Sequence, residues 1–202
     1  MSYSEVYVAE THALLDALDL PAVERLATGL AQVRDGGGRL FILGVGGSAG
    51  HASHAVNDFR KLCSFEAYAP TDNVPELTAR ANDEGWDTTF SGWLAGSRIS
   101  ARDAILIFSV GGGSSDVSTN LVRAIETARA KGSRIFGIVG RDGGMTREHA
   151  DVSVVIPPRF ADRVTPHTEG LSAVVWHLLV SHPVLQRVQT RWESLDLTRN
   201  PR

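Results

Sequence analysis

The chain has 202 residues, a formal net charge of −3 at pH 7 and a single cysteine, Cys63. This length predicts one domain over residues 1–202 that buries its core without crosslinks. The near-balanced charge excludes a broad basic surface for nucleic acid, and no apolar run approaches the ~20 residues that cross a membrane. The lone cysteine and the absence of a signal-peptide pattern predict a cytoplasmic protein.

Helical spacing of leucine and valine side chains predicts a helical N-terminal segment at about 4–35, with a break near Asp19–Pro21. An α/β core follows at about 39–182. Its continuous β-branched runs are typical of strands covered on both faces; they lie at about 39–45, 104–110, 134–140 and 152–157, with a shorter one near 65–69. Helices are expected at about 49–62, 75–82, 87–98, 115–131, 144–149, 168–180 and 185–195. The alternation predicts an α/β fold, a doubly wound and mostly parallel sheet flanked by helices.

Two of the predicted strands end in loops that are rich in glycine and serine. Gly46-Gly47-Ser48 follows the first strand, and Gly111-Gly112-Gly113-Ser114 follows the strand at about 104–110. Such loops bring free backbone N–H groups and hydroxyls to a helix N-terminus, where an anion is stabilised. Because both loops end parallel strands, they predict one site for a phosphorylated small molecule. The residues predicted to bind its phosphate are Gly47, Ser48, Ser109 and Ser114.

The first loop also matches a dinucleotide-binding pattern, Gly44-x-Gly46-x-x-Ala49, with Glu66 about twenty residues further on. Against this alternative, Gly47 and Ser48 add an amide and a hydroxyl suited to a phosphate monoester. A second serine-bearing loop also has no place in a nicotinamide site. We therefore favour a phosphate site.

Ionisable side chains follow the first loop and recur late in the chain. His51, His54 and Asp58 are spaced to project from one side of a helix. Glu169 and His177 lie on the last predicted core helix, where a histidine among apolar residues is costly without a partner. Such a set suits either of two tasks. It can move a proton between neighbouring carbons, or it can hold a divalent ion, for which zinc is the commonest fit.

Several of these residues together resemble the SIS (sugar isomerase) domain family. The matching features run from about Leu14 to Leu185 and comprise Gly44-x-Gly46-Gly47-Ser48 with His54, Asn82-Asp83, the Ser109 loop, Gly140-x-Asp142-Gly143-Gly144, Ala161-Asp162-Arg163 and His177. The resemblance implies an aldose–ketose isomerase that converts sedoheptulose 7-phosphate to an aldoheptose 7-phosphate through an enediol. It further implies a homotetramer with active sites at subunit interfaces and one zinc ion in each site.

The resemblance also assigns roles to individual residues. His54, Asp58, Glu169 and His177 would bind the metal, and Asp58, Glu169 and His177 would form the catalytic set. Ser48, Ser109 and Ser114 fall on phosphate-binding serines, whereas Asn82, Asp83 and Asp162 would contact the sugar. Two departures stand out: the loop at 109–114 lacks two hydroxyls of the family pattern, and residues 165–168 resemble an insertion. A SIS module that binds a sugar phosphate or a protein partner without catalysis is the alternative.

Overall fold

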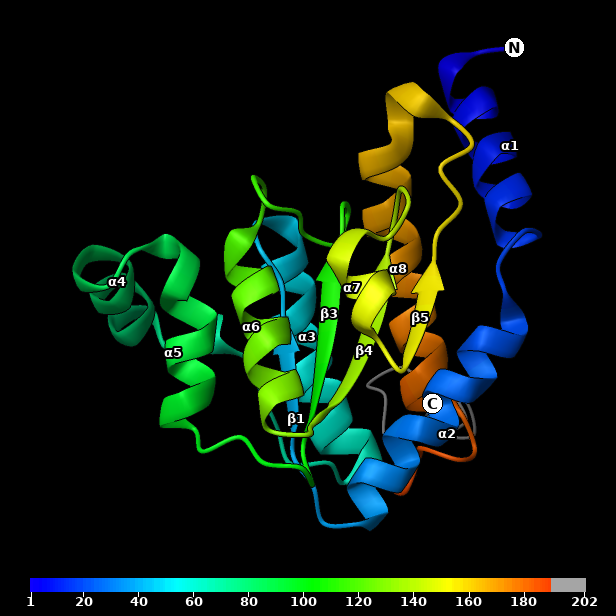
Figure 1. Ribbon diagram of the computed structural model, residues 1–202. Helices are drawn as coiled ribbons and strands as arrows, with labels where there is room; N and C mark the ends of the chain where they lie inside the picture. Colours follow the sequence, from blue (N-terminus) through cyan, green and yellow to red (C-terminus); the bar gives the residue numbers. More distant parts are fainter. Residues whose placement is uncertain (190–202) are drawn as a thin grey trace, which may run out of the picture.

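The computed structural model describes residues 1–189. A five-stranded sheet with the order β2-β1-β3-β4-β5 stands at its centre, and every neighbouring pair of strands is parallel (Figure 1). The strands are β1 (Leu40–Leu43), β2 (Ala67–Tyr68), β3 (Ala104–Ser109), β4 (Arg134–Val139) and β5 (Val152–Val155). This sheet confirms the predicted α/β class, because continuous apolar strands require cover on both faces.

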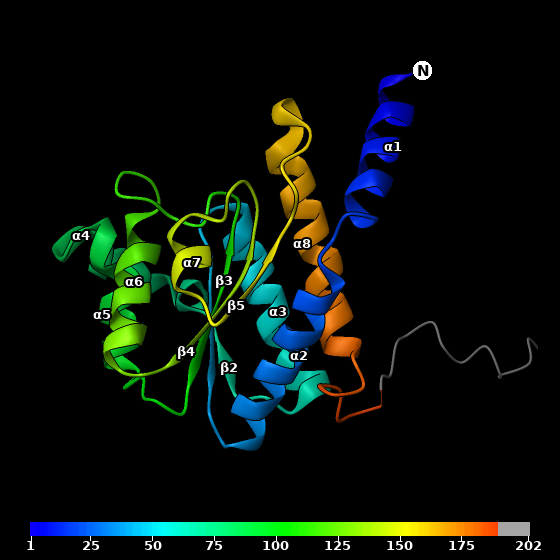
Figure 2. The ribbon, with the colours of Figure 1, turned by 45° about the vertical axis from the view of Figure 1, so that its right-hand side comes forward.

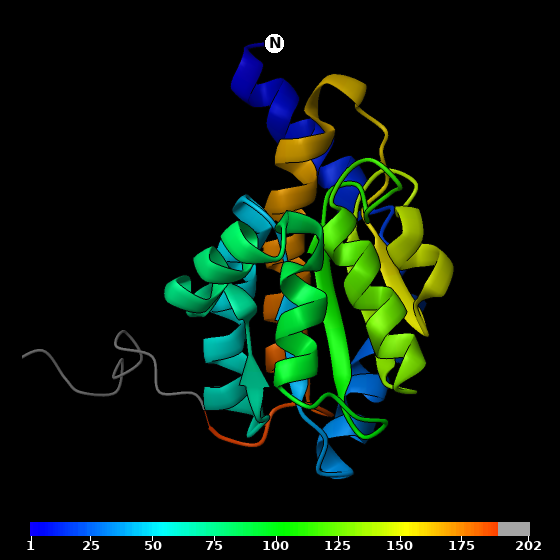
Figure 3. The same cartoon turned by 60° about the vertical axis from the view of Figure 1, so that its left-hand side comes forward.

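Residues 1–189 also contain helices, some of which cover the two faces of the sheet. They are α1 (Tyr3–Leu15), α2 (Leu20–Asp35), α3 (Gly47–Cys63), α4 (Val74–Asp83), α5 (Thr89–Gly96), α6 (Thr119–Ala130), α7 (Gly144–His149) and α8 (Val164–Ser181). One buried cluster joins α2, α3 and α8 to the sheet, and a second joins α5 and α6 to its other face (Figures 2 and 3). Within residues 1–189, no helix is long and apolar enough to cross a membrane.

Two helices begin at positions that differ from the prediction. Helix α6 begins at Thr119 rather than near 115, because the Ser114 hydroxyl accepts hydrogen bonds from the N–H groups of Asp116 and Val117 and forms a turn there. Helix α8 begins at Val164 rather than near 168. Pro166 fits its first turn, where the missing N–H has no partner in the helix. Residues 185–189 form no helix, and the rest of the helix expected at about 185–195 lies outside the described residues.

The start of α8 lies beside α1, beyond the carboxyl edge of the sheet (Figure 2), and an ion-pair network joins the two. The guanidinium of Arg163 donates to both carboxylate oxygens of Glu10 at 2.6 and 2.7 Å. The imidazole Nε2 of His167 lies 2.9 Å from the same carboxylate, and its ring stacks on Tyr7. The hydrogen bonds from Arg163 and then His167 lower the pKa of Glu10 to about 2. The side chain of His167 therefore helps to hold α8 against α1.

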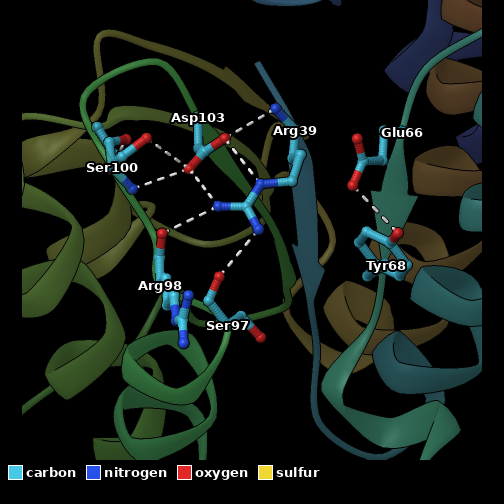
Figure 4. A network of polar contacts seen from close by, with 8 residues as sticks. Arg39, Glu66, Tyr68, Ser97, Arg98, Ser100 and Asp103 are labelled. Atoms are coloured by element: carbon cyan, nitrogen blue, oxygen red, sulfur yellow. Dashed lines mark hydrogen bonds and ion pairs between the residues drawn. The ribbon is translucent and has the colours of Figure 1, made fainter. Parts of the chain in front are cut away.

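A second network joins β1 to β3 at the opposite, amino-terminal edge of the sheet (Figure 4). The guanidinium of Arg39 donates to both oxygens of Asp103, at 3.1 and 2.9 Å, and Ser100 donates to the same carboxylate. Burial of Asp103 raises its pKa, but the hydrogen bonds from Arg39 and Ser100 outweigh it and lower the pKa overall. The carboxylate therefore stays charged in the folded protein.

We expect Asp103→Ala to destabilise the fold by about 3–5 kcal/mol at pH 7, because it leaves a partly buried guanidinium without its partner. Since folding lowers the Asp103 pKa, its stabilisation is present above the unfolded value of about 3.9 and is lost as the pH falls below it. Urea unfolding at pH 7 and at lower pH measures both effects. Asp16→Ala, at an exposed carboxylate, is the control; an equal midpoint for the two variants would contradict the prediction.

Candidate functional site

The two glycine- and serine-rich loops meet at the carboxyl edge of the sheet. They end β1 and β3, which are neighbours in the sheet. Between them and the start of α8 lies a cleft of about 700 Å³. Its lining includes Ser48, Ser109, Ser114 and Glu169. The structure thus brings together three of the predicted phosphate-binding serines and one of the predicted carboxylates.

The first loop leaves backbone donors free at the N-terminus of α3. Gly46 is the N-cap, with φ of +61°, and supplies no side chain to cap the helix. The first N–H groups of a helix have no partner inside it. Ser48, which is buried, lines the cleft one residue into the helix. This end of α3 is therefore an anion cradle without a built-in cap.

The second loop presents hydroxyl groups whose protons are donated to no other residue within 1–189. The Ser109 hydroxyl accepts a hydrogen bond from the N–H of Gly112 at 3.0 Å. The Ser114 hydroxyl accepts from the backbone N–H of Val117 at 3.1 Å. A hydroxyl has one donor proton and two acceptor lone pairs. Both serines therefore keep an O–H group to donate to a phosphate oxygen.

The carboxylate of Glu169 rests against the first loop. A Cβ placed on Gly47 would lie only 2.6 Å from Glu169 Oε1, which a real side chain would not tolerate. The glycine at this position lets α8 bring an acidic group to the start of α3. Glu169 therefore shares the cleft with the anion cradle.

A second group of ionisable side chains lies further along the same two helices. His54 and Asp58 come from α3 and His177 comes from α8, and one ligand atom from each lies within 4.8 Å of the others. Both imidazole Nε2 atoms face Asp58 Oδ2, at 3.8 Å from His54 and 3.9 Å from His177. The histidines are half exposed and the carboxylate is buried. This cluster has the donor types of a metal centre.

Neighbouring groups orient the cluster in the way that metal ligands require. His177 Nδ1 lies 2.7 Å from the carbonyl oxygen of Ala173, so that nitrogen carries the proton and Nε2 keeps its lone pair. The side chain of Asn57 donates to Asp58 Oδ1 at 2.8 Å, which leaves Oδ2 for a ligand. The buried indole of Trp176 packs against both imidazoles. The three side chains could therefore hold a metal ion together.

Comparison with known proteins identifies the family of this chain. A model of the SIS domain matches residues 6–140. The chain belongs to the SIS domain family. It is 30% identical over 193 residues to phosphoheptose isomerase from Chlorobaculum parvum, covering 92% of this chain and 86% of that one. Identity to phosphoheptose isomerase from Klebsiella pneumoniae is 32% over 180 residues, covering 85% and 88%.

Solved structures show the same fold. A phosphoheptose isomerase from Neisseria gonorrhoeae superposes with a TM-score of 0.75 at 23% identity, over 88% of this chain and 95% of that one. One from Francisella tularensis superposes with a TM-score of 0.73 at 20% identity, over 89% and 97%. The SIS arrangement of sheet and helices thus extends beyond the segment that the family model matches.

Other residues predicted from the sequence lie apart from these groups. Glu169 lines the cleft but is not in the metal-ligand group formed by the other three predicted ligands. Asn82 and Asp83 are exposed at the end of α4, where they hydrogen bond to each other. Asp162 is exposed in the short helical turn before α8. None of these last three residues lines the cleft.

The cleft residues that sequence reasoning missed include Arg141 and Ser118. Arg141 follows β4, and Ser118 precedes α6; both line the cleft, and both hold a left-handed backbone conformation. The sequence could have pointed to Arg141, because it lies between Gly140 and Asp142 in one of the patterns that resemble the SIS family. Nothing in the sequence marked Ser118, since the predicted helix covered it.

We expect the cluster to bind Zn²⁺ through His54, Asp58 and His177. Loss of an outer-shell partner weakens a metal site by about 10–100-fold, so His177→Ala, which removes a ligand, should weaken it by more. Competition with a chromogenic chelator measures the affinity. The exposed His12→Ala is the control, and equal zinc affinities in the two variants would exclude this site.

We expect Gly47→Ala to displace the Glu169 carboxylate while the protein stays folded. The backbone of Gly47 does not require glycine, and the clashing atom is the end of a flexible side chain. The variant should bind a sugar phosphate about tenfold or more weakly, because the displaced carboxylate no longer accepts hydrogen bonds from sugar hydroxyls, whereas binding of inorganic phosphate should not weaken. Thermal unfolding checks the fold, and calorimetric titration checks binding. Gly50→Ala, which meets open space, is the matched control; the same affinity in both variants would show that the contact has no role.

Proposed function

We propose that this protein, a sugar-phosphate isomerase of the SIS domain family, interconverts sedoheptulose 7-phosphate and an aldoheptose 7-phosphate through an enediol intermediate. One observation carries the proposal. The anion cradle and the cluster of His54, Asp58 and His177 lie along the same pair of packed helices, α3 and α8. One elongated substrate can therefore reach both.

The spacing along α3 suits a sugar with its phosphate at the far end of the carbon chain. His54 lies six residues beyond Ser48, which is about 9 Å along a helix. In sedoheptulose 7-phosphate, the carbonyl and its neighbouring hydroxyl are at carbons 2 and 1, and the phosphate is on carbon 7. With the phosphate in the cradle, the reacting carbons extend toward the cluster.

Two members of the cluster are suited to move the protons of an aldose–ketose isomerisation. Asp58 Oδ2 is held in place by Asn57 and can accept the proton from the carbon beside the carbonyl. While it is not bound to a metal, His177 Nε2 can accept a proton on the oxygen side of the same two carbons and return it, because its Nδ1 donates to Ala173. Glu169, which lies in the cleft, would accept hydrogen bonds from sugar hydroxyls and orient the chain.

The same residues support a role for zinc. His54, Asp58 and His177 would hold the ion, which supplies a Lewis acid for the carbonyl and hydroxyl oxygens of the substrate. Glu169, which the resemblance also assigns to the metal, would act on the sugar instead.

A neighbouring protomer would complete the pocket. His54 and His177 are half exposed, and the predicted sugar contacts Asn82, Asp83 and Asp162 are exposed outside the cleft. A homotetramer with interfacial active sites would bring such groups against the cluster and exclude water from it. This arrangement is the one that the family resemblance implies.

The test follows sedoheptulose 7-phosphate by NMR in the presence of the zinc-loaded protein. We expect aldoheptose phosphate to appear, to stop appearing after chelation, and to return when zinc is added. Asp58→Asn should lower kcat by about 10²–10⁴-fold, the usual contribution of acid–base catalysis. Glu169→Gln, which keeps the shape of the side chain, should mainly raise KM because it weakens the orientation of the sugar.

Unchanged substrate with a folded, zinc-loaded and oligomeric protein would contradict the proposal. If that protein still bound the sugar phosphate, the result would favour the alternative of a binding module without catalysis. Retained turnover in Asp58→Asn together with its loss in Glu169→Gln would transfer the role of the base to Glu169.

A further inference from the structure

The charges that line the cleft do not match a phosphate ligand unless Arg141 takes part. A phosphate monoester carries about −1.5 to −2 charge at neutral pH. Two of the residues lining the cleft, Asp142 and Glu169, are acidic, and both would repel it. Among the described residues that line the cleft, Arg141 is the only cationic side chain. The serines and backbone amides supply donors but no net charge.

The side chain of Arg141 is free to take a ligand. It forms no hydrogen bond or ion pair with any residue of the described range 1–189, and it is exposed. The adjacent Asp142 carboxylate is engaged elsewhere, since it accepts a hydrogen bond from the N–H of Gly144 at 3.1 Å. Other arginines near the sheet, such as Arg39 and Arg163, are held by carboxylates.

The loop that carries Arg141 is bound to the second phosphate loop. The N–H of Gly140 donates to the carbonyl oxygen of Ser109 at 3.2 Å. The N–H groups of Met145 and Thr146 donate to the carbonyls of Gly113 and Gly112, each at 3.0 Å. These hydrogen bonds hold residues 140–146 against the loop at 109–114. Arg141 therefore directly follows the residue that is hydrogen-bonded to Ser109, one of the proposed phosphate-binding serines.

The backbone of Arg141 is held in an unusual conformation. Its φ is +50°, in the left-handed region that side chains other than glycine rarely adopt. Two of the other non-glycine residues with positive φ, Ser64 and Arg98, end helices, where this conformation is ordinary. Arg141 instead follows a strand and lines the cleft, and strain of this kind gathers at ligand sites.

We propose that Arg141 binds the phosphate of the substrate and determines the preference of this site for an anionic sugar. The inference rests on the proposed function, because it takes a sugar phosphate as the ligand of the cleft. It also accounts for the loop at 109–114, where three consecutive glycines leave fewer hydroxyls to hold the anion. A guanidinium offers a fork of N–H donors that matches two phosphate oxygens.

The experiment compares wild type with Arg141→Lys and Arg141→Gln. Affinity for inorganic phosphate is measured by calorimetric titration, and KM and kcat are measured with sedoheptulose 7-phosphate. We expect Arg141→Gln to weaken phosphate binding and raise KM by about 10–100-fold, while kcat changes little, because the contact is equal in ground and transition states. Arg141→Lys keeps the charge but loses the fork, so its values should fall between the two.

Arg25→Ala is the matched control. Arg25 and Arg141 line one neighbouring pocket, but Arg25 does not line the cleft. Within residues 1–189, its only ion pair is a long one to Asp19 at 3.9 Å. Its removal should leave phosphate affinity and KM unchanged. Higher salt should also weaken phosphate binding more in wild type than in Arg141→Gln, since one charge contact is missing in the variant.

The outcomes separate this inference from the proposed function. Turnover in wild type with unchanged phosphate affinity and KM in Arg141→Gln would overturn the role of Arg141 and leave the isomerase standing. Weaker phosphate binding in Arg141→Gln without turnover in wild type would support Arg141 and overturn the isomerase. An equal loss of affinity in Arg25→Ala would also overturn the inference, because it would show a general effect of surface charge.

Discussion

Helix α3 packs along α8 on one face of the sheet, and this contact fixes both halves of the candidate site (Figure 2). At its first turn α3 meets Glu169, and about two turns later, at His54, it meets His177. Buried aromatic packing by Trp176 ties the two helices together beside the histidines. Helices packed this closely cannot slide by part of a turn, because their side chains interdigitate. The distance from the anion cradle to the cluster of His54, Asp58 and His177 is therefore set by the core.

Much of this arrangement can be predicted from the sequence, because it depends on local patterns. The strands and the two glycine-rich loops can be predicted from runs of apolar residues that end in glycine and serine. His54 and Asp58 face each other because they are one helical turn apart. The start of α6 could not be predicted, since a turn around the Ser114 hydroxyl competes with the helix. The meeting of His177 with Asp58 depends on how α3 packs against α8. These helices are far apart in the sequence, with strands β2 to β5 between them, so the residue spacing within either helix does not predict the contact.

Arg141 shows a second limit of sequence reasoning. We propose a role for Arg141 because the other described residues that line the cleft carry no positive charge. The charge of a cleft depends on which residues the fold brings together, and a sequence motif does not show it. Glycine-rich patterns draw attention to their fixed positions, and the residue between Gly140 and Asp142 is easily passed over. Hydrogen bonds from Met145 and Thr146 to the neighbouring loop bring it into the cleft. The net charge of the cleft becomes evident only when the loops that follow β1, β3 and β4 are brought together by folding.

Polar groups at the amino edge of the sheet are paired within the protein, whereas several at the carboxyl edge are not. At the amino edge, Arg39 and Asp103 satisfy each other and the adjoining backbone (Figure 4). At the carboxyl edge, the first amides of α3 have no capping side chain, and Arg141 has no partner in the described chain. Unpaired polar groups cost stability, so their gathering at one edge requires compensation elsewhere. The paired amino edge and the continuous apolar strands provide it, and the open donors remain for an anionic ligand.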